Sequence, residues 1–166
     1  QLNHLLTHTK LEFAAEGGST LFMDGVDISA EITSVQVTDF VSQVSAISEV
    51  REKLVQFQRE MAEGLNVVLE GRDIGTVVFP NADHKFFLVA DIHERARRRK
   101  KEMEAKGEVV SLEELTAEML ERDRKDSTRK HSPLKKAEDA VEIDTTGISI
   151  EEQVNRIVEI VNKTIK

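Results

Sequence analysis

The sequence contains no cysteine, tyrosine or tryptophan, only two prolines, and no apolar run near the length of a membrane span. Without cysteine, disulfide bridges and thiolate zinc sites are excluded, which suits a reducing compartment. The apolar stretch FFLVA at residues 86–90 is far too short to cross a bilayer, and no signal-peptide pattern opens the chain. The five histidines lack metal-ligand spacing. We therefore expect a cytoplasmic protein with no membrane segment and no metal ligands in this chain.

Negative charge is in excess overall, with 31 acidic against 23 basic side chains and a net charge of −8. The balance reverses between residues 95 and 136, where 14 basic side chains outnumber nine acidic ones. A basic block in an acidic protein favours a local anionic ligand, although a solvated helix face gives the same pattern. Nucleic-acid binding is disfavoured, because acids interleave the block and phenylalanine is the only large aromatic residue available for stacking.

The first 29 residues show two different sequence patterns, one helical and one typical of strands. Residues 1–10 are typical of the end of a helix. Residues 11–29 then alternate like a three-stranded meander, with turns predicted at Gly17-Gly18 and Asp24-Gly25.

Helices and strands alternate in the remaining sequence. A helical period from residue 34 to 63, with a break near Ser48 and a stop at Gly64, comes first. Strands are predicted at residues 66–70, 84–90 and 139–144. Further helices are predicted at residues 93–106, at residues 111–130 after a Ser111–Glu114 capping box, and after a second capping box of Ser149 and Glu152. This order predicts an α/β fold with a parallel sheet.

An arginine and a carboxylate follow the first of these buried strands, in the stretch LEGRDIGTVVFP. Ligands of parallel α/β sheets bind beyond the carboxyl ends of the strands, where Arg72 could grip a phosphate through two parallel hydrogen bonds. Gly71 and Gly75 would let the backbone turn and a ligand approach. A salt bridge between Arg72 and Asp73 that merely closes the loop is equally consistent with the sequence.

A second group of charges occupies the stretch ERDRKDSTRK. The spacing of Arg122, Asp126 and Arg129 predicts that the three share one helix face, either as a salt-bridge ladder or as clamps for an anionic ligand. Further arginines, Arg95, Arg98 and Arg99, lie on the preceding predicted helix. The two basic helices would face one another as a hairpin, which suits a lid for phosphoryl transfer.

The chain resembles the bacterial-type cytidylate kinases in four stretches that occur in the same order. These are VSQVSAISEVREKLVQFQRE, EGRDIGTVVFPNADHKFFLVA, ERARRRKKEMEAKG and ERDRKDSTRKHSPLKKAEDAVEIDTT. The resemblance implies a P-loop nucleoside-monophosphate-kinase fold, a parallel sheet with helices on both faces, plus a small antiparallel insert. It implies an enzyme that uses Mg²⁺ and ATP to phosphorylate CMP or dCMP, acts as a monomer, and binds neither nucleic acid nor membrane.

The resemblance also assigns roles to residues at matching positions. Cytosine would be read by Ser42, Arg51 and Asp73. The CMP phosphate would be held by Arg72 and Arg129, and the ribose side contacted by Arg122 and Asp126; Arg129 and Arg122 are the predicted catalytic residues. The chemistry is consistent, because cytosine offers an amine to a carboxylate and acceptors at N3 and O2 to an arginine.

The chain departs from the family in having no G-x-x-x-x-G-K-[ST] motif among its 166 residues. The resemblance would place that P-loop and the first strand in a missing upstream segment of roughly 60 residues. On this interpretation, residues 1–64 form the monophosphate-binding region, residues 65–92 and 137–166 the core, and residues 93–136 the lid. The chain alone would then lack kinase activity. The alternative is a non-catalytic module that binds CMP or another small anion.

Overall fold

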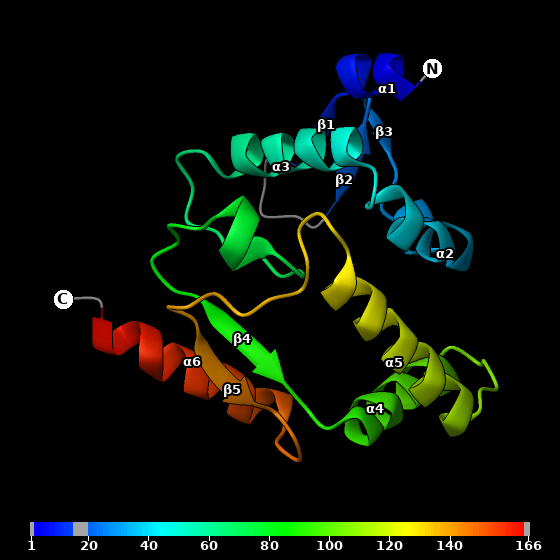
Figure 1. Ribbon diagram of the computed structural model, residues 1–166, viewed down its shortest axis with the longest axis vertical. Helices are drawn as coiled ribbons and strands as arrows, with labels where there is room; N and C mark the ends of the chain where they lie inside the picture. The colour runs from blue at the N-terminus through cyan, green and yellow to red at the C-terminus, as the bar shows by residue number, and fades with distance from the viewer. Residues whose placement is uncertain (1, 15–19, 165–166) are drawn as a thin grey trace. The chain divides into compact units, whose positions relative to one another are not determined.

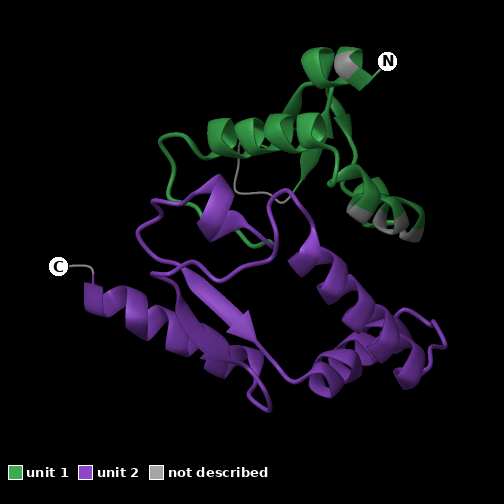
Figure 2. Cartoon of the chain, in the orientation of Figure 1, with its two compact units in different colours: residues 1–71 green, residues 72–166 purple. Residues whose placement is uncertain are grey.

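A computed structural model of the chain describes residues 2–14 and 20–164, without the side chains of residues 3, 35, 38, 39 and 42. The chain divides into two compact units, residues 1–71 and residues 72–166, which are coloured separately in Figure 2. No helix in the described part of the chain is both long and apolar enough to span a membrane.

The first unit contains a small antiparallel sheet preceded by helix α1 (Leu2–His8). Its strands are β1 (Leu11–Phe13), β2 (Leu21–Met23) and β3 (Val26–Asp27), and they pair in the order β1-β2-β3 (Figure 1). Asp24 and Gly25 form the turn between β2 and β3 with φ angles of 53° and 82°, as a two-residue hairpin requires. The predicted meander is confirmed, whereas the predicted Gly17-Gly18 turn lies outside the described residues.

Two helices follow the meander after the short 3₁₀ turn η1 (Glu31–Thr33). Helix α2 (Val35–Val44) starts where the Ser34 hydroxyl accepts a hydrogen bond from the Val37 amide. Helix α3 (Ser48–Ala62) buries Val50 and Val55. The predicted break near Ser48 and the stop at Gly64, whose φ is 73°, are both confirmed.

The strand predicted at residues 66–70 is not formed. This segment is irregular, and the side chains of Val67 and Val68 are exposed. A run of β-branched residues favours an extended backbone, but a strand also needs a neighbour to accept and donate its hydrogen bonds. No described strand supplies that neighbour.

The second unit is built around a two-stranded parallel sheet of β4 (Phe86–Val89) and β5 (Val141–Asp144). Leu88 lies opposite Ile143, which is buried. The strands at residues 84–90 and 139–144 are therefore confirmed in their core, and so is their parallel pairing. The fold is mixed α/β, with one antiparallel and one parallel sheet.

Three helices complete the second unit: α4 (Ile92–Ala105), α5 (Leu112–Thr128) and α6 (Ile150–Thr164). Helices α4 and α5 pack on one another as the predicted hairpin (Figure 1). Both predicted capping serines act as predicted on the amides three residues later, and Glu152 also accepts a hydrogen bond from the Ser149 amide. Helix α5 ends at Thr128, slightly before the predicted Lys130.

A π-helical turn, η2 (Ile74–Val78), follows Asp73. The Asp73 carbonyl accepts hydrogen bonds from the amides of Val77 at 2.8 Å and of Thr76 and Val78 at 3.3 Å. The sequence predicted a glycine-assisted turn at this place. However, neither Gly71 nor Gly75 has a left-handed φ. The turn is therefore stabilised by the hydrogen bonds to the Asp73 carbonyl and does not depend on the conformational freedom of glycine.

Candidate functional site

Asp126 is the centre of a charged cluster in the second unit. Its side chain accepts a hydrogen bond from Arg72 Nε at 2.8 Å on Oδ2, and Arg129 Nη1 lies 3.9 Å from Oδ1. Asp126 is only 6% exposed. The backbone fixes it from the other side, because the Leu134 amide donates to the Asp126 carbonyl at 2.8 Å. Two cations thus converge on one buried carboxylate.

The two arginines are held in different ways. Arg129 is the C-cap of α5, has an extended backbone with ψ of 144°, and donates from Nε to the Ser132 carbonyl at 2.5 Å. Arg72 is more exposed, at 40% of its side chain, and among the described residues it is held only through Nε. Its two Nη groups therefore have donor capacity for an anion that approaches the cluster.

This geometry corrects the predicted shared helix face. Arg129 lies beyond the last helical residue, so the i, i+4, i+7 spacing does not place it in line with Arg122. Arg122 is exposed and makes no hydrogen bond or ion pair within residues 2–14 and 20–164, so the ladder from Arg122 to Asp126 is not formed. The carboxylate is bridged instead to Arg72, which is 54 residues away in the sequence.

Asp73 is also buried, at 3% exposure, and lies at the start of η2. The sequence also allowed a salt bridge between Arg72 and its neighbour Asp73. Arg72 is held by a different carboxylate, because its Nε donates to Asp126. The adjacent residues Arg72 and Asp73 are thus anchored to different parts of the unit, one to α5 and the other to η2.

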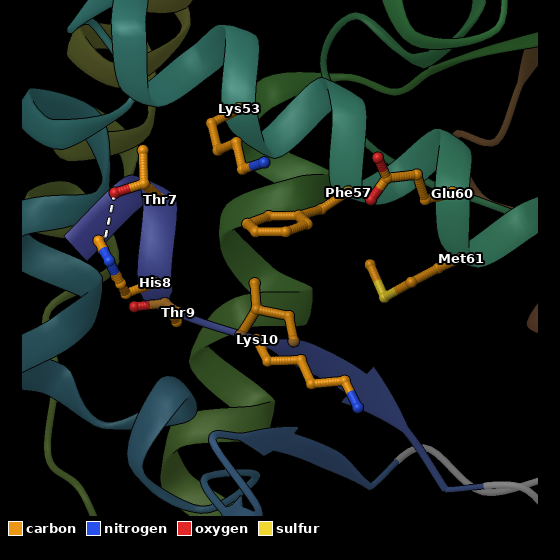
Figure 3. A pocket seen from close by; sticks show the side chains of 9 residues that line it. Thr7, His8, Thr9, Lys10, Lys53, Phe57, Glu60 and Met61 are labelled. Carbon is orange, nitrogen blue, oxygen red and sulfur yellow. Dashed lines mark hydrogen bonds between the residues drawn. The ribbon is translucent and has the colours of Figure 1, made fainter. Parts of the chain in front are cut away.

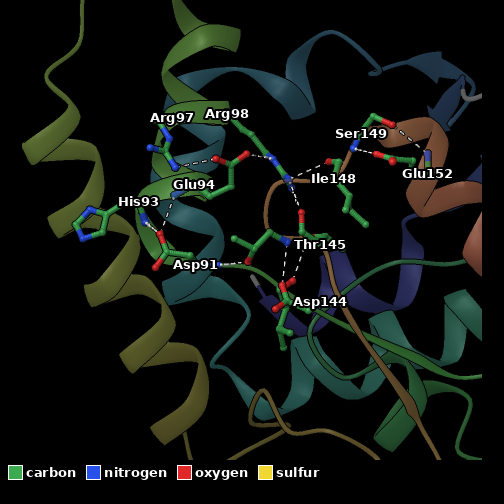
Figure 4. A network of polar contacts seen from close by, with 12 residues as sticks. Asp91, His93, Glu94, Arg97, Arg98, Asp144, Thr145, Ile148, Ser149 and Glu152 are labelled. Carbon is green, nitrogen blue, oxygen red and sulfur yellow. Dashed lines mark hydrogen bonds and ion pairs between the residues drawn. The ribbon is translucent and has the colours of Figure 1, made fainter.

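The arginines of α4 have structural partners. Arg95 makes two hydrogen bonds to the Asp123 carboxylate on α5, at 2.5 and 3.1 Å. Arg98 pairs with Glu94 at 3.0 Å and donates to the carbonyls of Thr145 and Ile148 after β5, at 2.6 and 3.4 Å, as Figure 4 shows. The predicted hairpin is confirmed, but Arg95 and Arg98 already donate to carboxylates and carbonyls of the fold.

Two further predicted site residues belong to the first unit. Arg51 lies on α3, where its side chain is partly buried and engaged in a contact. Ser42 lies in α2, and its side chain is outside the described part of the chain. Their grouping with the cluster around Asp126 stays a prediction.

Comparisons with known proteins agree on one family. A sequence model described as "Cytidylate kinase" matches residues 1–163. A cytidylate kinase of Lactobacillus johnsonii is 44% identical over 98% of this chain and 71% of its own length. The corresponding values are 50%, 97% and 72% for one from Geobacillus sp., and 52%, 90% and 66% for one from Caldanaerobacter subterraneus. The chain belongs to the cytidylate kinase family. The family prediction and the predicted enzyme class, an ATP-dependent phosphotransferase, are confirmed.

A separate hollow of about 450 Å³ lies in the first unit, between the end of α1 and α3 (Figure 3). Its lining mixes Lys10, Lys53, Phe57 and Glu60. Lys10 is paired with Glu12, and the Lys53 ammonium lies over the Phe57 ring and donates to Gln56. These cations already have partners, and no residue predicted from the cytidylate kinase resemblance lines the hollow.

Sequence reasoning missed one buried charge in this family member. Lys85 immediately precedes β4, and its side chain is 7% exposed. Its ammonium donates to the Pro80 carbonyl at 2.5 Å and to Asp139 at 2.6 Å. A lysine directly before the apolar run FFLVA was the available signal, but nothing local in the sequence indicates which partners it reaches.

Proposed function

We propose that this chain carries the acceptor-binding and lid parts of a kinase that transfers the γ-phosphoryl group of ATP to CMP or dCMP. The observation that supports this most is the convergence of Arg72 and Arg129 on buried Asp126. A carboxylate between two guanidinium groups holds them close together before substrate arrives, so less ordering is needed on binding. Such a pair suits an incoming phosphate, which offers several oxygens to arginine donors.

The proposed roles follow from the chemistry of each group. Arg72 and Arg129 hold the CMP phosphate, Arg129 also neutralises charge on the transferring group, and Arg122 is the second proposed catalytic residue. Asp126 orients the arginines and accepts from a ribose hydroxyl, to which Arg122 also donates. Buried Asp73 accepts from the cytosine amine, while Arg51 and Ser42 of the first unit complete the reading of the base.

The ATP side of the reaction requires residues that this chain does not supply. The sequence has no P-loop motif, and the described residues contain no group of three or more His, Asp or Glu side chains suited to a metal ion. No step is therefore assigned to Mg²⁺ held by this chain. We propose that a P-loop segment with the first strand precedes these residues in the complete protein, in keeping with relatives of which the chain covers about 70%. Residues 66–70, which the sequence predicts as a strand and which are irregular here, are the segment with which we propose that this first strand pairs through its backbone.

The proposed functional regions have the boundaries that were predicted from the sequence. Residues 1–64 bind the monophosphate, residues 65–92 and 137–166 belong to the α/β core with helices on both faces, and residues 93–136 close over the substrates. We place the protein in the cytoplasm as a monomer that binds nucleotides and neither nucleic acid nor membrane.

The proposal is tested by comparing the complete gene product with the 166-residue chain. The complete protein should phosphorylate CMP and dCMP in the presence of Mg²⁺ and ATP, whereas the 166-residue chain should bind CMP weakly without turnover. Calorimetric titration with CMP and a coupled ADP-release assay measure the two properties. Robust turnover by the 166 residues would refute the proposed absence of the ATP site. CMP binding without turnover in the complete protein would favour the non-catalytic module instead.

A further inference from the structure

Lys85 ties together three segments of the second unit: the loop after η2, the start of β4 and the start of β5. Its backbone carbonyl accepts a hydrogen bond from the Val141 amide at 2.9 Å, which joins the starts of β4 and β5. Its ammonium binds the Pro80 carbonyl, which follows η2, and the Asp139 carboxylate, which precedes β5. The hydrogen bond from Lys85 holds the pKa of Asp139 below its ordinary value.

The aliphatic part of the same side chain lies against η2. A Cβ atom built on Gly75, the second residue of η2, would come within 3.2 Å of Lys85 Cδ and 3.5 Å of Cγ. Gly75 has no left-handed φ, so its lack of a side chain serves this close approach and not a special backbone shape. Lys85 therefore contacts η2 with its methylene groups and the loop behind it with its ammonium.

The turn that Lys85 supports begins at Asp73. Three amides of η2 donate to the Asp73 carbonyl, and Val78, at the end of the turn, is almost completely buried. A shift of η2 would thus carry the Asp73 backbone with it. Arg72 has an independent anchor, because Asp126 on α5 holds its guanidinium group. The two neighbouring residues respond to different supports.

We propose that Lys85 is a positioning residue for base selection. It holds η2, and through η2 the carboxylate of Asp73, without touching substrate. This inference rests on the proposed function, in which Asp73 reads cytosine. Lys85 would affect the preference for CMP over UMP but not the binding of the phosphate. Loosening η2 should therefore reduce preference for the base while the phosphate contacts through Arg72 and Arg129 remain.

The test uses the complete protein and compares kcat/KM for CMP and UMP. Lys85→Met keeps the methylene groups and removes the ammonium, and we expect the CMP/UMP preference to fall roughly tenfold, mainly through KM for CMP. Lys85→Arg retains a charged donor and should restore most of the preference. Lys136→Met is the control, because Lys136 also pairs with a carboxylate of the second unit, Glu142 of β5 at 3.1 Å, but is exposed and makes no hydrogen bond to η2 or to the loop after it among the described residues. The control should keep the wild-type preference.

Each outcome separates the inference from the function on which it rests. A wild-type enzyme without preference for CMP contradicts the proposed base reading itself. A clear wild-type preference that Lys85→Met leaves unchanged, or equal losses with both substrates, overturns the role of Lys85 alone.

If Lys85→Met does not fold, as judged by circular dichroism, Asp139→Asn decides the matter. Asp139 is 66% exposed, so this change removes a partner of the ammonium without opening the core. The preference should fall in the same direction and by less, and an unchanged preference would overturn the inference. Gly75→Ala, which pushes on the Lys85 stem, should act in the same direction.

Discussion

Helix α4 and the end of helix α5 are both rich in arginine, yet they use it differently. On α4, Arg95 and Arg98 are engaged with an opposing carboxylate and with loop carbonyls, which join α4 to its neighbours. At the end of α5, Arg129 and Arg72 share one carboxylate, so positive charge exceeds negative charge locally. The first arrangement satisfies its donors within the fold, and the second retains capacity for an anion.

This difference shows why the count of basic residues alone was a poor guide to the proposed anion site. The excess positive charge of residues 95–136 suggested a local anionic ligand, although a solvated helix face gives the same pattern. The structure divides the block: several arginines form local pairs, such as Arg124 with Glu121 at 2.7 Å. What distinguishes a ligand-binding arginine is the ratio of donors to nearby acceptors, which depends on the fold.

The sharpest test of the comparison is Arg129→Ala in the complete enzyme. We expect kcat to fall on the order of 10³-fold, because this partly buried guanidinium would neutralise charge on the transferring group. Arg124→Ala on the same helix, which removes only an exposed pair with Glu121, should leave steady-state kinetics nearly unchanged. A raised KM with an unchanged kcat would show that Arg129 binds only the ground state.

Asp73→Ala tests whether the buried carboxylate beside the cluster reads the base. Loss of a charge-assisted hydrogen bond to the cytosine amine should cost about 2–4 kcal/mol of discrimination, so kcat/KM for CMP should fall tens to hundreds of times more than that for UMP. Asp83→Ala, a change in the exposed loop before β4, serves as the control. Equal losses with both substrates would reduce Asp73 to a structural role.

Arg98→Ala tests whether the arginines of α4 stabilise the fold. Removing its hydrogen bonds to Thr145 and Ile148 should lower the free energy of unfolding by about 1–3 kcal/mol, as measured by urea denaturation. Arg97→Ala, which removes one exposed pair with Glu94, should cost much less. If Arg98→Ala left stability intact but abolished CMP binding, Arg98 would belong with the proposed ligand-binding arginines, Arg72 and Arg129.

The smallest effect concerns Glu121, an exposed acid on α5. Hydrogen bonds from Arg124 lower its pKa from an ordinary 4.5 to about 2. Because the folded-state pKa is depressed, the stabilisation is present above pH 4.5 and is lost as the pH falls towards 2. Glu121→Gln should make the fall in Tm over this range slightly shallower, by about one degree or less. In 1 M NaCl the two proteins should coincide, and identical curves at low salt would contradict the prediction.

Elements defined by neighbouring residues were predictable from the sequence. The Asp24-Gly25 turn, the capping box of Ser149 and Glu152, and the stop at Gly64 each depend on a few adjacent residues with strong backbone preferences. The order of these elements also predicted the parallel pairing of β4 and β5, because parallel strands require a crossover connection.

The parts that escaped prediction depend on contacts between distant residues. The partner of Arg72 lies on α5, the partner of Lys85 lies before β5, and η2 forms because one carbonyl accepts several amides. The predicted strand at residues 66–70 is absent for the same reason. A strand forms when a neighbouring strand pairs with it, and the composition of residues 66–70 does not show whether such a neighbour exists. Residue types in the candidate site were therefore predictable, but the way they are held was not.

The parallel pairing of β4 with β5 also constrains the order in which the second unit can fold. The hairpin of α4 and α5 lies between the two strands in the sequence, so Leu88 cannot meet Ile143 until the whole hairpin has left the ribosome. Contacts within the hairpin close short loops, whereas the sheet closes a long one. The helical hairpin can therefore form before the sheet, because within the described residues β5 is the strand that pairs with β4 and it is synthesised last.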